Sequence, residues 1–145
     1  MPRLTFPFVP DGLLVPSLIG LGAPAMQSLQ AQGAALPGPV QARGMFDSGT
    51  TVTAVAPWVL SALNATPGAA TQTRTAAGTV NVHFYQVSFT IYNLASGGSS
   101  LTRPDWIVTN LILDLDDVDV LFGLDLLHEI VQTVDGPRDF FTLDF

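Results

Sequence analysis

Short apolar runs, separated by clusters of Pro, Gly, Asp and other polar residues, extend along almost the whole chain and predict a mostly β protein. The first two runs lie on either side of Pro10-Asp11-Gly12 and predict a hairpin with edge character. The last two runs predict a second hairpin across residues 135–138. The predicted strands cover residues 4–9, 13–21, 40–46, 80–91, 106–113, 118–122, 130–134 and 140–145.

The middle of the chain combines a polar segment with one long predicted strand. Residues 68–78 are polar and rich in Thr and Ala, so we expect a loop there. In the strand that follows, apolar residues alternate on one face as far as Phe84 and in the opposite phase from Tyr85 onward. This change of phase between Phe84 and Tyr85 predicts a β-bulge or a bend.

Helical segments are short in this sequence. Pro57 is well placed to open one of them, and Asp125 suits the dipole at the start of another. Residues 22–39 are rich in Gly, Ala, Pro and Gln and almost uncharged, which indicates an insertion in a hairpin. With no internal repeat, residues 1–145 are predicted to form a single domain that carries this insertion. The expected helices cover residues 25–30, 57–63 and 124–129.

Composition changes the expected assembly more than the expected fold. Hydrophobic residues make up 48% of the chain and charged residues only 12%, which is low for a small monomer with a hydrated surface. Burial of surface against a second copy would relieve this imbalance, so a homodimer is favoured. The net charge of −7 argues against a nucleic-acid partner, which requires a basic surface. The absence of Cys excludes disulfides and thiolate chemistry.

Membrane insertion and secretion are not expected from the apolar pattern. No apolar run approaches the roughly 20 residues of a membrane-spanning helix. Residues 13–21 are apolar and precede Ala23-Pro24-Ala25, which is similar to a signal-peptide cleavage site. However, Pro16 interrupts this run, and Arg3 alone supplies positive charge ahead of it. We therefore expect a cytoplasmic protein without a membrane partner, and leave a secreted or periplasmic location open.

The most informative motif is Asp47-Ser48-Gly49, which follows an apolar strand within residues 44–52, GMFDSGTTV. Asp47 could act as one of two carboxylates that share a proton and polarise a water molecule. The hydroxyl of Ser48 could hydrogen-bond to an opposing loop, and Gly49 lets the backbone turn sharply and aim its N–H at the carboxylate. A lone triplet of this kind is often an ordinary turn. A second signal strengthens it, namely the sequence VLFGLDLL at residues 120–127.

Together these segments resemble the retropepsin-like aspartic proteases, the single-lobed relatives of pepsin. Members of that family have an apolar strand that leads into D-[ST]-G-[AST], a flap hairpin with a glycine at its tip, and then two apolar residues, Gly and a short helix. This chain supplies Met45–Thr50, Thr75–Gly78 and Leu121–Leu127 in the same order. The Gly-Leu-Asp sequence is closer to cellular and bacterial members. Retroviral members usually pair an Arg at the position of Leu124 with an Asp at the position of Thr51, and both are missing here.

The resemblance implies an all-β, closed barrel-like fold, the acid protease fold of a single lobe, with one short helix after Gly123. It implies an aspartic endopeptidase that cleaves peptide or protein substrates and uses no metal and no organic cofactor. Because the chain has only one D-[ST]-G motif, the resemblance also implies a homodimer with one Asp47 from each subunit. The expected catalytic residues are Asp47, Ser48 and Gly49, and the expected substrate-binding residues are Thr50, Ala76, Ala77 and Gly78.

Alternatives remain at the level of function. The same fold could serve as a dimeric peptide-binding or structural module with little or no proteolysis. A phosphatase of the haloacid-dehalogenase type is disfavoured, because the second Asp of its motif is absent and the chain has no Lys.

Other candidates for chemistry favour structural roles. His83 and His128 are too isolated to form a metal site or a Ser/His pair. The acidic residues Asp114, Asp116, Asp117 and Asp119 could bind a hard cation, but their spacing favours a solvated turn. Arg74 lies near the expected flap and could contact substrate, although an exposed loop Arg is the default interpretation.

Overall fold

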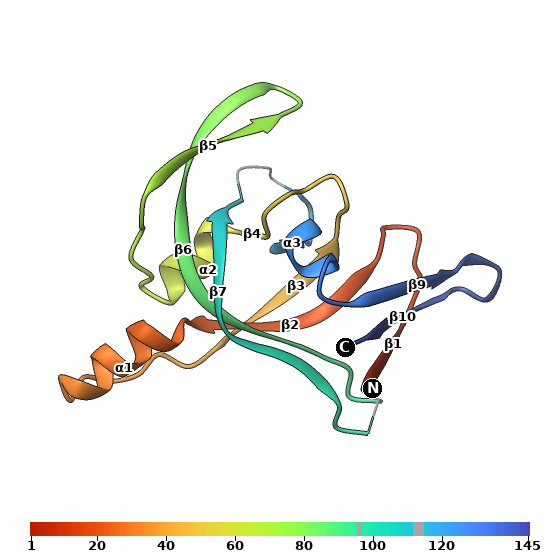
Figure 1. Cartoon of the computed structure of the whole chain (residues 1–145), viewed down its shortest axis with the longest axis horizontal. Coiled ribbons are helices and arrows are strands. Elements are labelled where there is room, and N and C mark those ends of the chain that lie inside the picture. Colours follow the sequence, from red (N-terminus) through yellow and green to blue (C-terminus); the bar gives the residue numbers. More distant parts are fainter. Residues whose placement is uncertain (96, 112–114) are drawn as a thin grey trace.

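A closed ring of six strands forms the body of the protein in a computed structural model that describes residues 1–95, 97–111 and 115–145 (Figure 1). The ring closes because β6 pairs with β2 as well as with β7, so the expected all-β, closed barrel-like fold is confirmed. In ring order the strands are β2 (Leu14–Leu21), β3 (Val40–Phe46), β8 (Val120–Phe122), β4 (Ala54–Val55), β7 (Ser100–Asn110) and β6 (Gly78–Tyr92), and β5 (Ala70–Thr75) extends the sheet beyond β6.

A separate three-stranded sheet has the order β1 (Arg3–Pro7), β10 (Phe140–Asp144) and β9 (Val131–Asp135). The hairpin expected at the end of the chain is confirmed, and a short 3-10 turn at Gly136–Arg138 connects its strands. The prediction of a hairpin near the start of the chain is wrong, because β1 pairs antiparallel with β10 instead of with β2. The two ends of the chain therefore lie side by side (Figure 1).

Contacts between the first and last strands explain this pairing. The rings of Phe6 and Phe141 stack with their centroids 5.3 Å apart, and both side chains are buried. Three residue pairs away along the same ladder, Arg3 Nε donates to Asp144 Oδ1 over 2.6 Å. Burial of a large apolar side chain stabilises a fold by roughly 1.5–3 kcal/mol, so the burial of both rings favours the pairing of β1 with β10.

The hairpin of β5 and β6 extends beyond the ring, at the top of Figure 1. Our expectation of a loop over residues 68–78 is wrong, because residues 70–75 form β5 and pair with β6. Its β-branched Thr residues are half-buried and alternate with exposed residues, a pattern that suits a strand although it is not apolar. A turn at Ala76-Ala77 joins β5 to β6, and Gly78 follows with φ +122°.

The irregularity expected in β6 is present, but its position was misjudged. The register shifts between Val87 and Phe89, and the predicted site at Phe84 and Tyr85 is paired regularly. In β7 the shift falls where Pro104 lies between the paired residues Arg103 and Trp106. Proline has no N–H to donate to the ladder, which explains the position of the bulge. Strand β7 also begins earlier than expected, and the predicted end of that strand at residue 113 lies outside the described residues.

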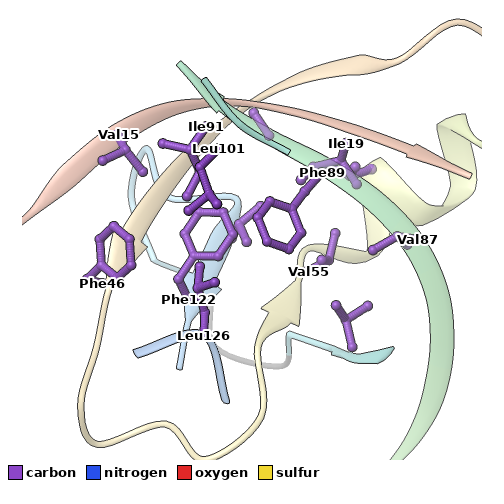
Figure 2. Close-up of a cluster of buried hydrophobic side chains, with 14 of the residues drawn as sticks. Val15, Ile19, Phe46, Val55, Val87, Phe89, Ile91, Leu101, Phe122 and Leu126 are labelled. Atoms are coloured by element: carbon purple, nitrogen blue, oxygen red, sulfur yellow. The ribbon is translucent and has the colours of Figure 1, made fainter. Parts of the chain in front are cut away.

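The core fills the inside of the ring. Figure 2 shows Phe122 at its centre, between Phe46 and Phe89, with ring centroids 5.4 Å and 5.3 Å from Phe122. Phe46 and Phe122 are the residues directly before Asp47 and Gly123, and both are buried. Their packing anchors the ends of β3 and β8 and so fixes the two loops that follow.

Three short helices, α1 (Ala23–Ala31), α2 (Pro57–Ala62) and α3 (Leu124–Leu127), occupy the expected places. Residues 22–39, which contain α1, connect the antiparallel neighbours β2 and β3, and α1 projects to the lower left in Figure 1. The assignment of residues 1–145 to one domain with an insertion at 22–39 stays a prediction. Within the described ranges, none of the helices has the length and apolar character needed to cross a membrane.

Candidate active site

The loop that carries Asp47 begins where β3 ends, beside the end of β8. These two strands are parallel neighbours, with Phe46 opposite Phe122. The backbone N–H of Asp47 donates to the carbonyl of Phe122 over 3.0 Å. The two motifs identified in the sequence therefore meet at one edge of the barrel.

Both carboxylate oxygens of Asp47 accept a hydrogen bond within the loop. The backbone N–H of Gly49 donates to Oδ1 over 2.8 Å, and the hydroxyl of Thr50 donates to Oδ2 over 2.9 Å. A Cβ at position 49 would lie 3.1 Å from Oδ1, so a larger residue there would move the carboxylate by a few tenths of an ångström. The side chain of Asp47 is half-buried, and Ser48 is exposed. This arrangement holds a carboxylate in a fixed direction and leaves it open to solvent on one side.

Thr50 has a contact that the sequence analysis did not anticipate. We expected it to bind substrate, whereas its hydroxyl donates to Asp47 and its carbonyl accepts the N–H of Leu124 over 2.8 Å. At Gly123 the backbones approach so closely that a Cβ would lie 2.5 Å from the Thr50 carbonyl oxygen. Residues 47–53, which we name the catalytic loop after the role expected of Asp47, are thus packed directly against the start of α3.

Asp125 is a further residue of the site, and from the sequence we expected only that it suits the dipole at the start of α3. Its carboxylate accepts hydrogen bonds from both the backbone N–H and the hydroxyl of Thr53, over 3.0 Å and 2.8 Å. The one signal in the sequence is its position directly after Gly123-Leu124. Nothing local identifies Thr53 as its partner.

A cleft of about 680 Å³ lies between the catalytic loop and the hairpin of β5 and β6. Among the residues expected to form the site, Asp47, Gly49, Thr50 and Ala76 line this cleft. Ala77 and Gly78 lie at the exposed tip of the hairpin, outside that lining. The other lining residues are Thr51, Val52, Ala54, Thr71, Gln72, Thr73, Arg74, Thr75, Phe84, Thr109, Asn110, Leu111 and Leu121.

A larger cavity of about 830 Å³ lies between α1, the end of α2 and the base of the β5–β6 hairpin. Among the described residues that line it there is no Asp, Glu or His, so it offers no carboxylate or imidazole, and Tyr85 is its one titratable group. The smaller cleft beside Asp47 is therefore the candidate active site.

The other candidate residues have structural contacts or exposed positions. Asp119 accepts the backbone N–H of Arg43 over 2.9 Å and the indole N–H of Trp58 over 3.0 Å. His83 and His128 are exposed. In the part of the chain that the structure describes, His, Asp and Glu form no group of three that could hold a metal ion. Asp114, another residue of the acidic segment, lies outside the described residues.

Comparisons with known proteins concern the family and the fold of the chain. The family model described as "Aspartyl protease" matches residues 33–126. A retropepsin-like aspartic protease from Rickettsia conorii has the same fold, with a TM-score of 0.61 at 14% identity over 99% of this chain and 91% of that chain. The protease of simian foamy virus (mac) superposes with a TM-score of 0.43 at 16% identity, over 77% of this chain and 88% of that one. No curated protein matches the sequence.

Proposed function

The chain belongs to the aspartyl protease family, and from this premise we propose that it is an endopeptidase that works as a homodimer. The observation that carries the proposal is the carboxylate of Asp47. It lies in the cleft beneath the β5–β6 hairpin, with both oxygens oriented by donors from its own loop. A carboxylate held in this way is suited to activate a water molecule for attack on a peptide bond.

The homodimer follows from the number of carboxylates that the reaction needs. Water activation and protonation of the substrate carbonyl require two acidic groups, and the chain has one D-[ST]-G motif. A two-fold axis beside the loop would bring a second Asp47 to the first and complete the site. The exposed hydroxyl of Ser48 is then available to hydrogen-bond the partner's loop.

The surface of the smaller sheet supports this association. Strand β9 is an edge strand, and its Val131 and Val134 side chains are 56% and 46% exposed. An uncovered edge offers unpaired backbone groups to another strand. We propose that a second copy of the chain covers this edge, which would also bury the two valines.

In the proposed mechanism the two Asp47 carboxyl groups share one proton. The ionised one removes a proton from water as the water oxygen attacks the scissile carbonyl carbon, and the protonated one donates to the carbonyl oxygen. The resulting gem-diol collapses, the C–N bond breaks, and a proton passes to the leaving nitrogen. No step requires a metal or an organic cofactor.

Substrate is proposed to lie extended between the catalytic loops and the two hairpins, each of which acts as a flap. Strand-like hydrogen bonds would hold its backbone, with Thr50 on the floor of the cleft and Ala76, Ala77 and Gly78 on the flap. A cytoplasmic location remains part of the proposal.

Replacement of Asp47 by Asn tests the function directly. The amide keeps the shape of the side chain but cannot act as a base, so cleavage of a denatured protein should fall to background while the dimer persists. Asp105→Asn, on exposed residue Asp105 in β7, is the matched control and should retain wild-type activity. Residual activity in purified Asp47→Asn protein would refute the role of Asp47.

Two further measurements on the wild type test the shared site. Its rate should follow a bell-shaped pH profile on the acid side of neutrality, because the singly protonated pair is the active form. Specific activity should fall on dilution, together with the dimer fraction in sedimentation. An active monomer would refute the dimer. Peptide binding without cleavage between about pH 3 and pH 7 would instead identify a binding module.

A further inference from the structure

We propose that Asp125 is a positioning residue of the catalytic loop, and that it must be a carboxylate because every group it contacts is a donor. This inference rests on the proposed function, since it concerns the loop that presents Asp47. Asp125 lies on α3, two residues after Gly123, and its side chain is half-buried.

Four hydrogen bonds converge on the Asp125 carboxylate. Oδ1 accepts from the Thr53 hydroxyl over 2.8 Å and from the backbone N–H of Leu126 over 3.0 Å. Oδ2 accepts from the backbone N–H of Thr53 over 3.0 Å and from the indole N–H of Trp106, also over 3.0 Å. These donors come from three separate segments of the chain, so one side chain connects the end of the catalytic loop, β7 and α3.

The directions of the hydrogen bonds exclude an amide as an equivalent. Three of the four donors are N–H groups, which cannot act as acceptors. The fourth, the Thr53 hydroxyl, also accepts the backbone N–H of Gly123 over 3.2 Å and so donates toward Asp125. An Asn at position 125 would place its NH₂ group against at least one N–H in either orientation. That partly buried donor would then lose its partner.

The Trp106 contact extends this connection toward the flap. Trp106 lies on β7 opposite Val87 of β6, the strand that continues into the flap hairpin. Its ring packs edge-on against Phe89, with centroids 5.6 Å apart. Asp125 therefore holds the catalytic loop in a fixed position relative to the strand pair from which the flap extends.

Asp125→Asn in the full chain tests the proposal, and Asp119→Asn is its matched control. Asp119 also accepts an indole N–H and a backbone N–H, from Trp58 and Arg43, at a place that does not line the cleft. We expect kcat of Asp125→Asn to fall about 10- to 100-fold with KM within about twofold, because small displacements of a catalytic group carry costs of that size. Asp119→Asn should retain kcat within about twofold.

The two tryptophans allow the same comparison without any enzyme assay. Trp58 and Trp106 are the only indoles in the chain. In ¹H–¹⁵N spectra, Asp125→Asn should shift the Trp106 indole signal and accelerate amide exchange in residues 49–53, while the Trp58 signal stays in place. Asp119→Asn should shift the Trp58 signal and leave both the Trp106 signal and the exchange of residues 49–53 unchanged. Equal loss of activity in both variants, or unchanged exchange in residues 49–53 of Asp125→Asn, would overturn the proposal.

A second pair of variants covers the case in which Asp125→Asn does not fold. Thr53→Ser keeps the hydroxyl between Gly123 and Asp125, whereas the isosteric Thr53→Val removes it. The value of kcat should fall further in Thr53→Val than in Thr53→Ser, and equal kcat in the two would overturn the proposal. If the wild type shows no turnover, the proposed function fails. The role of Asp125 is then tested by amide exchange alone: residues 49–53 should exchange faster in Thr53→Val than in Thr53→Ser, and equal exchange would overturn it.

Discussion

Gly123 offers a sharp test of how closely the catalytic loop depends on α3. At this residue φ is −97° and ψ is −166°, a backbone conformation that any residue adopts. Replacement by Ala therefore adds no backbone strain, and its cost comes from the new methyl group alone. That Cβ would lie 2.5 Å from the carbonyl oxygen of Thr50 and 3.1 Å from its carbonyl carbon.

The required movement sets the size of the effect. Cβ contacts below 3.0 Å essentially do not occur in proteins, so Thr50 and α3 must separate by at least about 0.5 Å. The separation also stretches the 2.8 Å hydrogen bond from Leu124 N–H to the Thr50 carbonyl. Overpacking of this kind destabilises a fold by about 1–3 kcal/mol. A 1 Å misplacement of a catalytic group can lower the rate by about 10²-fold, so a displacement of about 0.5 Å predicts about a 10-fold loss of kcat.

The assay compares Gly123→Ala with Gly136→Ala, in which the added Cβ meets no atom within 4 Å. The free energy of unfolding comes from urea titration, and kcat from peptide cleavage at a temperature where each variant is folded. The free energy of unfolding of Gly136→Ala should lie within about 0.5 kcal/mol of the wild-type value, and its kcat should be unchanged. Wild-type kcat in Gly123→Ala would show that the contact between Thr50 and α3 does not hold the catalytic loop in place.

Two other substitutions probe the flap and the smaller sheet. Gly78→Val places a β-branched residue at φ +122° on the tip of the proposed flap, so it should lower turnover far more than it lowers stability. Gly98→Val, at φ +89° in the connection between β6 and β7, is its control and should leave turnover unchanged. Equal kinetics in the two variants would make Gly78 an ordinary turn residue. Hydrogen bonds from the Arg3 guanidinium hold the pKa of Asp144 below its ordinary value. The stability this contributes is present above the unfolded pKa and is lost as the pH falls through the folded one. The free energy of unfolding of Asp144→Asn, measured by urea titration, should therefore differ most from the wild-type value near neutrality and least near about pH 3. An equal difference across that pH range would contradict the linkage.

The parts of this fold that could be predicted from sequence are those that depend on local pattern. Strands such as β3 and the β9–β10 hairpin have apolar residues and turn signals that lie close together in the chain. Helix α2 begins at a proline that is favourable in the first turn. The catalytic loop is also local, because Asp47, Gly49 and Thr50 satisfy one another within four residues.

The parts that were missed depend on long-range contacts or on polar strands. Pairing of β1 with β10 joins the two ends of the chain, and no nearby residue encodes it. Strand β5 has no apolar residue larger than Ala, so the sequence pattern indicated a loop. The segment is a strand because it pairs with β6. The hydrogen bonds on which the proposed role of Asp125 rests come from Thr53 and Trp106, which are far from it in sequence.

The pairing of β1 with β10 also constrains the order in which the protein can form during synthesis. The strand Arg3–Pro7 leaves the ribosome before its partner Phe140–Asp144 and before every strand that lies between them in the sequence. Until then Leu4 and Phe6, which are buried in the finished fold, have no strand to cover them. Contacts of such high sequence separation form slowly and expose apolar surface to aggregation in the meantime. A nascent chain therefore lacks the β1–β10–β9 sheet, and with it the edge proposed to receive a second copy, until translation has passed residue 144.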